Sequence, residues 1–155
     1  MTEIERIQDQ LHRAHNGAAW HGPSLNELLA DVTAEQAIAH PVANAHSIWE
    51  LVHHIVTWEN VVLRRLKGEE VSSREITEDV NFSAAEEATE TTWQKAKQQL
   101  DESAAALRER LAQMTDEQLD DQVANRNRML YFEIHGAIQH ALYHAGQIAL
   151  LKKML

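Results

Sequence analysis

The chain has 155 residues, of which 44% are apolar and 25% are charged, values typical of a folded globular protein with a sizeable core. Its net charge of −10 opposes binding to nucleic acids, and the absence of Cys excludes disulfides, thiolate metal ligands and a Cys nucleophile. No apolar run approaches the roughly 20 residues that cross a membrane, and the polar N-terminus has no signal-peptide core. We therefore expect a cytoplasmic protein that binds neither nucleic acid nor membrane. Its ten His are the unusual feature of the composition.

The first part of the chain is predicted to be helical. Apolar residues recur at steps of three and four over 3–18, the spacing of an amphipathic helix, and Gly17 marks its end. Capping boxes, in which Ser or Thr is followed three residues later by Glu or Gln, then open short helices at Ser24 and Thr33. Pro41 ends the second of these, because the residue before proline disfavours the helical conformation.

Three more long helices are predicted, over about 47–67, 83–114 and 129–153. The first two begin at further capping boxes, Ser47 to Glu50 and Ser83 to Glu86, and another box at Thr115 precedes a short acidic turn. A polar, irregular loop is expected over 68–82. Since no segment has the pattern of a strand and no repeat is present, we predict an all-α fold, a four-helix bundle with short extra helices, in one domain spanning 1–155.

The last predicted helix carries His140 and His144, which are four residues apart and therefore share one face. Gln147 and Gly136 lie on the same face, and His135 points away from it. Two histidines so placed can hold one metal ion if a third ligand comes from a neighbouring helix. The same spacing also arises by chance, with the imidazoles serving as ordinary core residues.

His53 and His54, in the predicted helix 47–67, are the candidates for that third ligand. Both flank the apolar stripe of the helix and point about 100° apart, so a single site takes only one of them. Helical periodicity alone does not choose between the two.

Three blocks of the sequence resemble the DinB-like superfamily of four-helix-bundle metalloproteins: Trp20-His21-Gly22-Pro23-Ser24-Leu25, Ser47-Ile48-Trp49-Glu50-Leu51-Val52-His53-His54-Ile55 and His140-Ala141-Leu142-Tyr143-His144-Ala145-Gly146-Gln147-Ile148. Their order and separations match over nearly the whole chain. In that family one His of the second helix and an HxxxH pair of the last helix bind one divalent metal. The resemblance implies His54, His140 and His144 as ligands, since the family's His directly precedes an aliphatic residue, as His54 precedes Ile55.

Three neutral imidazoles leave coordination positions open, which is typical of a catalytic rather than a structural metal site. Nitrogen ligands suit zinc, nickel, iron or copper, and the sequence does not choose among these metals. Affinity is expected to fall below about pH 6, where ordinary His side chains become protonated.

Residues near these blocks have both a functional and a structural interpretation. Gln147 can hydrogen-bond a metal-bound water or pair with a neighbouring helix, and Tyr143 can donate a proton, bind substrate or pack in the core. Glu133 is either a pocket carboxylate or a partner of the helix dipole. Trp20 and His21 either line the pocket mouth or anchor a turn. Glu50 is one turn before His54 and can orient it, but we prefer its role in the capping box. Arg126 and Arg128 can receive an anionic substrate, although solvated loop charges are the preferred interpretation.

The resemblance implies a metal-dependent enzyme acting on a small molecule, either a thiol-dependent transferase or isomerase, as in bacillithiol and mycothiol S-transferases and maleylpyruvate isomerase, or a hydrolase. Without Cys in the chain, the thiol must be a diffusible low-molecular-weight cosubstrate. No catalytic residue is identified. Alternatives are a non-catalytic metal-binding stress-response protein and a bundle without metal. Family members are often homodimers, and a homodimer is expected on that ground alone.

Overall fold

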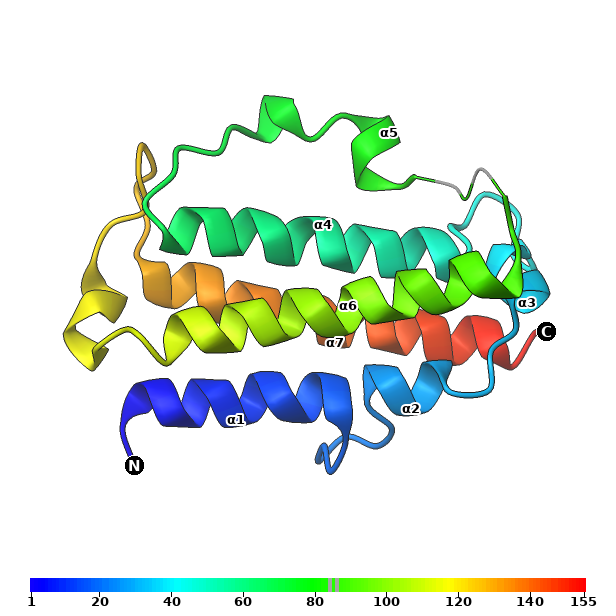
Figure 1. The fold of residues 1–155 in the computed structure, drawn as a ribbon, viewed down its shortest axis with the longest axis horizontal. Coiled ribbons are helices and arrows are strands. Elements are labelled where there is room, and N and C mark those ends of the chain that lie inside the picture. Colours follow the sequence, from blue (N-terminus) through cyan, green and yellow to red (C-terminus); the bar gives the residue numbers. More distant parts are fainter. Residues whose placement is uncertain (84, 86) are drawn as a thin grey trace.

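Four long helices form the bundle in the computed structural model, which describes residues 1–83, 85 and 87–155 (Figure 1). They are α1 (Glu3–Asn16), α4 (Ile48–Leu66), α6 (Glu90–Leu111) and α7 (Leu130–Lys152). Helix α4 packs against both α6 and α7, and α1 packs against the same two helices. The predicted all-α four-helix bundle is confirmed, and no β-strand occurs in the described part of the chain.

Short helices lie in the connections. Helices α2 (Leu25–Leu29) and α3 (Ala34–Ile38) cover one end of the bundle, and the 3₁₀ helix η2 (Asp116–Asp120) packs against α7. The connection from α4 to α6 runs back along the outside of α4 and contains η1 (Ser73–Glu75) and α5 (Glu78–Asn81) (Figure 1). The expectation of an irregular loop over 68–82 missed these two elements, because three or four residues are too few to show a hydrophobic period.

Capping boxes set the helix starts that the sequence predicted at Ser24, Thr33 and Ser47. At α4, the Ser47 N–H donates to Glu50 Oε2 at 2.7 Å, and the Glu50 N–H donates to Ser47 Oγ at 3.2 Å. Two N–H groups that the helix leaves without partners are thereby satisfied. The preferred capping role of Glu50 is therefore present in the structure.

The predicted start of the third long helix is wrong. The box expected over 83–86 includes positions 84 and 86, which lie outside the described residues, but residues 87–89 are not helical and α6 begins after Thr89. There the Thr89 hydroxyl accepts the N–H of Thr92 at 3.2 Å, and the Thr89 N–H donates to the Thr92 hydroxyl at 3.0 Å. A threonine thus takes the place of the usual Glu or Gln, so this helix start lacks the sequence pattern on which the prediction depended.

Two apolar clusters fill the bundle, one toward each end. A buried polar group separates them: Glu59 of α4 lies between Ile55 of one cluster and Val62 of the other. Glu59 is 2.7 Å from His15 Nε2 and accepts a 2.5 Å hydrogen bond from the Ser103 hydroxyl. Among the described helices, none is both long and apolar enough to span a bilayer.

Candidate metal centre

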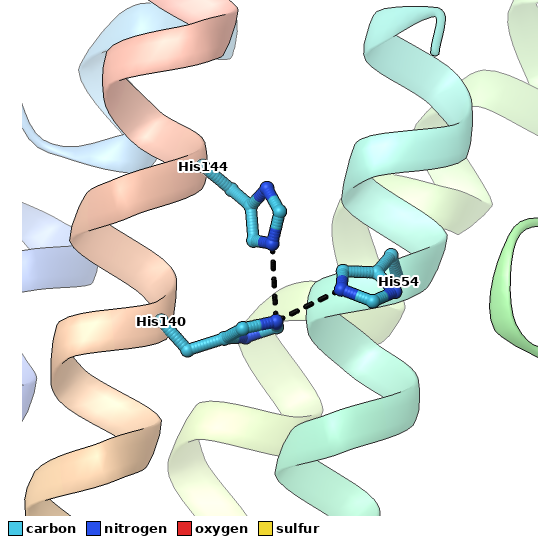
Figure 2. A group of neighbouring side chains, drawn as sticks. All are labelled: His54, His140 and His144. Carbon is cyan, nitrogen blue, oxygen red and sulfur yellow. Dashed lines mark hydrogen bonds between the residues drawn. The ribbon is translucent and has the colours of Figure 1, made fainter. Parts of the chain in front are cut away.

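The side chains of His54, His140 and His144 meet between α4 and α7 (Figure 2). His140 Nε2 lies 2.9 Å from His54 Nε2 and 3.0 Å from His144 Nε2. The i, i+4 spacing on α7 brings the last two rings to one face, and the packing of α4 against α7 brings His54 opposite them. His54 and His144 keep only 7% and 6% of their exposure, so the three nitrogens converge at a largely buried point.

The outward-facing nitrogen of His54 is fixed by Asn81, the last residue of α5. Asn81 Oδ1 lies 2.7 Å from His54 Nδ1 and 2.9 Å from Trp58 Nε1. Because an indole N–H can only donate, the shared Asn81 atom acts as an acceptor, and His54 must carry its proton on Nδ1. The lone pair of His54 Nε2 is then directed at the other two histidines.

The other two histidines differ at their outward-facing nitrogens. His144 Nδ1 lies 2.5 Å from Gln147 Oε1, one turn further along α7, so His144 is held like His54. His140 Nδ1 is buried and has no hydrogen-bond partner among the residues that the structure describes. Gln147 therefore acts on the far side of the ring from the point where the three nitrogens meet, and not on a water there, as one sequence-based interpretation proposed.

Burial keeps these histidines neutral. Desolvation, with the positive charge that His144 would carry as a second cause, lowers the pKa of His54 to about 4. Desolvation, followed by the positive charges that His144 and His54 would carry, lowers the pKa of His140 to about 3. Desolvation also lowers the pKa of His144. His54 and His140 are therefore free of added protons at pH 5 to 6. The loss of metal affinity expected below about pH 6 moves to more acidic conditions.

The donor set fits a metal ion. Because Asn81 and Gln147 hold protons on the outward-facing nitrogens of two rings, the Nε2 lone pairs of His54 and His144 both point at His140 Nε2, at 2.9 and 3.0 Å, and a proton on that atom can satisfy only one of them. His140 can bring one proton, but a single cation satisfies all three nitrogens. Metal–nitrogen bonds of about 2.0–2.1 Å would need His140 Nε2 only slightly further from the Nε2 atoms of His54 and His144 than it is. The group can hold one metal ion.

Aromatic rings and two cavities surround the site. Phe82 stacks on His54 with ring centroids 4.1 Å apart, and His46 stacks on the other face of Phe82 at 3.6 Å. A cavity of about 170 Å³ lies beside His140, and a larger one of about 490 Å³ lies beside His144. Small molecules can therefore approach the three histidines from two directions.

Other histidines named from the sequence lie away from this group. His53 is half-buried, and its Nε2 contacts the backbone oxygen of Val80 at 3.0 Å. The ring of His135 packs against that of Tyr131 with the two planes tilted by 44°. The structure thus brings His54, and not His53, to the pair on α7.

Several candidate pocket residues have other neighbours. Trp20 and His21 are exposed and line a separate cavity against α1. Tyr143 is largely exposed at the edge of the larger cavity. Gly136 lines the smaller cavity, together with Glu133, which is buried in contact with Arg65 and Arg128.

Sequence reasoning did not identify Asn81, Trp58 or Phe82 as part of the site. Asn81 and Phe82 lie in and after α5, a segment with no recognisable helical pattern, and reach His54 only because the connection returns along α4. For Trp58 a signal was present, since it follows His54 by four residues and therefore lies on the same face of α4.

Comparison with known proteins identifies the family. The family model described as the DinB superfamily matches residues 18–148. No curated protein sequence matches this chain. Among solved structures, the chain is similar to the crystal structure of a conserved protein from Enterococcus faecalis, with a TM-score of 0.74 and 22% identity over 99% of this chain and 97% of that chain. At that identity the likeness shows the fold alone. Because the family match extends over most of the sequence, the chain belongs to the DinB superfamily.

Proposed function

We propose that His54, His140 and His144 bind one divalent transition-metal ion, and that the protein is a metal-dependent enzyme acting on a small molecule. The observation that supports the ligand set is the convergence of three Nε2 atoms, two of them on rings whose outward nitrogens contact amide oxygens. Amide partners of this kind orient ligating histidines and increase their basicity.

An enzymatic role is favoured by the space around the ligands. Three protein ligands leave a position open, and the cavities beside His140 and His144 give access to it. A bound ion would supply a Lewis acid that lowers the pKa of a thiol or water beside it. The chain's own contribution is to hold three neutral imidazoles in place and to exclude water through Phe82 and the neighbouring apolar side chains.

Transfer of a diffusible thiol to an electrophile is the reaction type we propose first. Without Cys, the chain has no thiol nucleophile of its own. The larger cavity has apolar walls suited to an electrophile, contributed by Leu51, Phe82, Leu150 and Leu151. Hydrolysis is the second candidate, favoured by the same open position, at which water replaces the thiol.

Metal-loaded protein purified without an affinity tag tests the proposal. We expect conjugation of monochlorobimane with at least one member of a panel of low-molecular-weight thiols, and no conjugation by His140→Ala. The His53→Ala variant is the matched control, since His53 is the neighbouring histidine of α4 and lies outside the group. Activity that is independent of every thiol would reject the transferase. Failure of the wild type to bind metal would reject the whole proposal.

A further inference from the structure

A buried ion cluster lies beside the three histidines. Arg65 of α4 donates to Glu133 of α7 at 2.7 Å, and both side chains are nearly inaccessible, with 3% and 4% exposure. Arg128, just before α7, also contacts the carboxylate of Glu133. Two guanidinium groups therefore share one carboxylate, which leaves an excess of positive charge in a chain whose net charge is −10.

The excess of positive charge also affects a third arginine, Arg126. Burial and the positive charges of Arg65 and Arg128 lower the pKa of Arg126, against the opposite effect of Glu133. The Arg126 guanidinium itself donates to the backbone oxygen of Val71 at 2.8 Å. The local field therefore favours an additional anion.

Two buried nitrogen atoms in the same region have no partner. Arg65 Nε is buried without a hydrogen-bond acceptor, and so is His140 Nδ1, within the described part of the chain. Leaving a buried donor unpaired costs more than its hydrogen bond would contribute, and the cost is greatest on a charged group. An ion cluster with only a structural role would be expected to pair Arg65 completely.

Arg65 and His140 line the same cavity, which has a volume of about 170 Å³. Its other walls include Arg128, Trp58 and Phe132, and the Arg128 guanidinium lies 5.5 Å from the centre of the Phe132 ring. Engineered protein cavities of about 150 Å³ bind benzene, so a group of that size fits. Gly136 opens the space further, because a Cβ built there meets no atom within 4 Å.

The geometry points to an anion subsite: the cavity between Arg65, Arg128 and His140 binds a carboxylate group of the substrate or cosubstrate. Arginine presents a planar pair of N–H donors that matches a carboxylate, and Trp58 and Phe132 can contact its apolar part. The role in catalysis rests on the proposed function, since it depends on the metal beside His140. The anion subsite itself consists of protein groups and can be tested without metal.

Titration of isotope-labelled, metal-free and metal-loaded protein with propionate and benzoate tests this inference. The reporter is the indole N–H resonance of Trp58, identified by Trp58→Phe. We expect saturable binding of a carboxylate in both forms, and binding at least about tenfold weaker for propionamide and benzamide. Tighter binding of inorganic phosphate than of either carboxylate would overturn the assignment, as would equal binding of acids and amides.

Two matched pairs of variants locate the subsite. Arg128→Gln should weaken carboxylate binding about tenfold, whereas Arg126→Gln, at a half-buried arginine outside the cavity, should change it less than twofold. Gly136→Leu should fill the cavity and abolish binding, whereas Gly146→Leu, at a glycine of α7 with equally open surroundings, should not. Binding unchanged in both Arg128→Gln and Gly136→Leu would overturn the inference.

The two proposals fail in different ways. If carboxylates bind the metal-free protein but no metal is taken up, the subsite stands and the proposed function is rejected. If metal binds with the expected ligands but carboxylates do not bind either form, the subsite is rejected and the metal site stands. Binding that requires metal and is insensitive to Arg128→Gln places the anion on the ion alone and also rejects the subsite.

Discussion

At the scale of one residue, Asn81 shows how this chain orients His54, a proposed metal ligand. Its side-chain oxygen accepts from Trp58 and from His54, so the orientation of the amide is defined by the indole and the tautomer of His54 is defined by the amide. His54 is thereby presented with its Nε2 lone pair toward α7. Asn81 is a positioning residue, because its side chain contacts His54 Nδ1, on the far side of the ring from the point where the three histidines meet.

Replacing Asn81 tests this role. We expect Asn81→Ala to lower metal affinity about 10- to 100-fold, the usual effect of removing a partner that orients a ligand. Asn81→Asp should restore affinity, because a carboxylate also accepts from Nδ1. Competition with a coloured chelator measures both, and Trp58→Phe is the control that removes only the indole donor. Wild-type affinity in Asn81→Ala would show that His54 needs no orientation from this residue.

The lowered pKa values of His54 and His140 predict a pH dependence of stability in the metal-free protein. In the unfolded chain these rings titrate near 6.5, but in the folded protein they titrate at about 4 and about 3. Between pH 6.5 and 4 the unfolded state binds more protons, so stability is complete above pH 6.5 and falls as pH decreases. Between pH 7 and pH 5, the protonation of His54 in the unfolded state lowers the free energy of unfolding by on the order of 2 kcal/mol.

Urea unfolding of metal-free wild type and His54→Ala at pH 7 and pH 5 measures this effect. We expect the wild type to lose more stability than the variant between the two pH values. An equal loss in both proteins would contradict the burial of a neutral His54. His53→Ala, at a half-buried histidine outside the group, should behave as the wild type does.

At the scale of single elements, α4 is the helix on which the site depends, since it carries His54, Trp58 and Arg65. Its start is determined by the reciprocal hydrogen bonds of Ser47 and Glu50. We expect Ser47→Ala to lower the free energy of unfolding by about 1–2 kcal/mol, because a buried cap is lost. Metal affinity under folding conditions should stay unchanged, since His54 is two turns further along the helix.

Thermal or urea unfolding measures that loss, and Thr2→Ala provides the comparison at the exposed cap of α1. Ser47→Ala should lower the free energy of unfolding more than Thr2→Ala does. Ser47 is buried, whereas water can replace the exposed hydroxyl of Thr2. The reverse order would contradict the account of the α4 start.

The helices also show how much of the structure can be predicted from the sequence. Long helices and their caps follow from local chemistry, so α4 and α7 lie within one residue of the predicted ranges and His140 and His144 share the expected face. Short elements such as α5 have no such pattern, and the contact of Asn81 with His54 depends on how the connection folds back over α4. Neither that contact nor the pairing of Arg65 with Glu133 can be derived from spacing along the chain.

On the scale of the whole molecule, the bundle places polar groups in a limited zone between two apolar clusters. The three histidines join α4 to α7, and Glu59 joins α4 to α1 and α6 through His15 and Ser103. A metal bound by ligands from two helices stabilises only the folded state. A bound metal would therefore hold α4 and α7 together next to the cavities that lie beside His140 and His144.

The metal content of tag-free protein, purified without chelator, tests the central claim most directly. Elemental analysis should find about one divalent transition-metal ion per chain in the wild type and in His53→Ala. It should find almost none in His54→Ala and His140→Ala, provided that circular dichroism shows both variants to be folded. Loss of the metal in His53→Ala with retention in His54→Ala, or a wild type without stoichiometric metal after incubation with zinc, nickel or iron, would contradict the proposed three-histidine site.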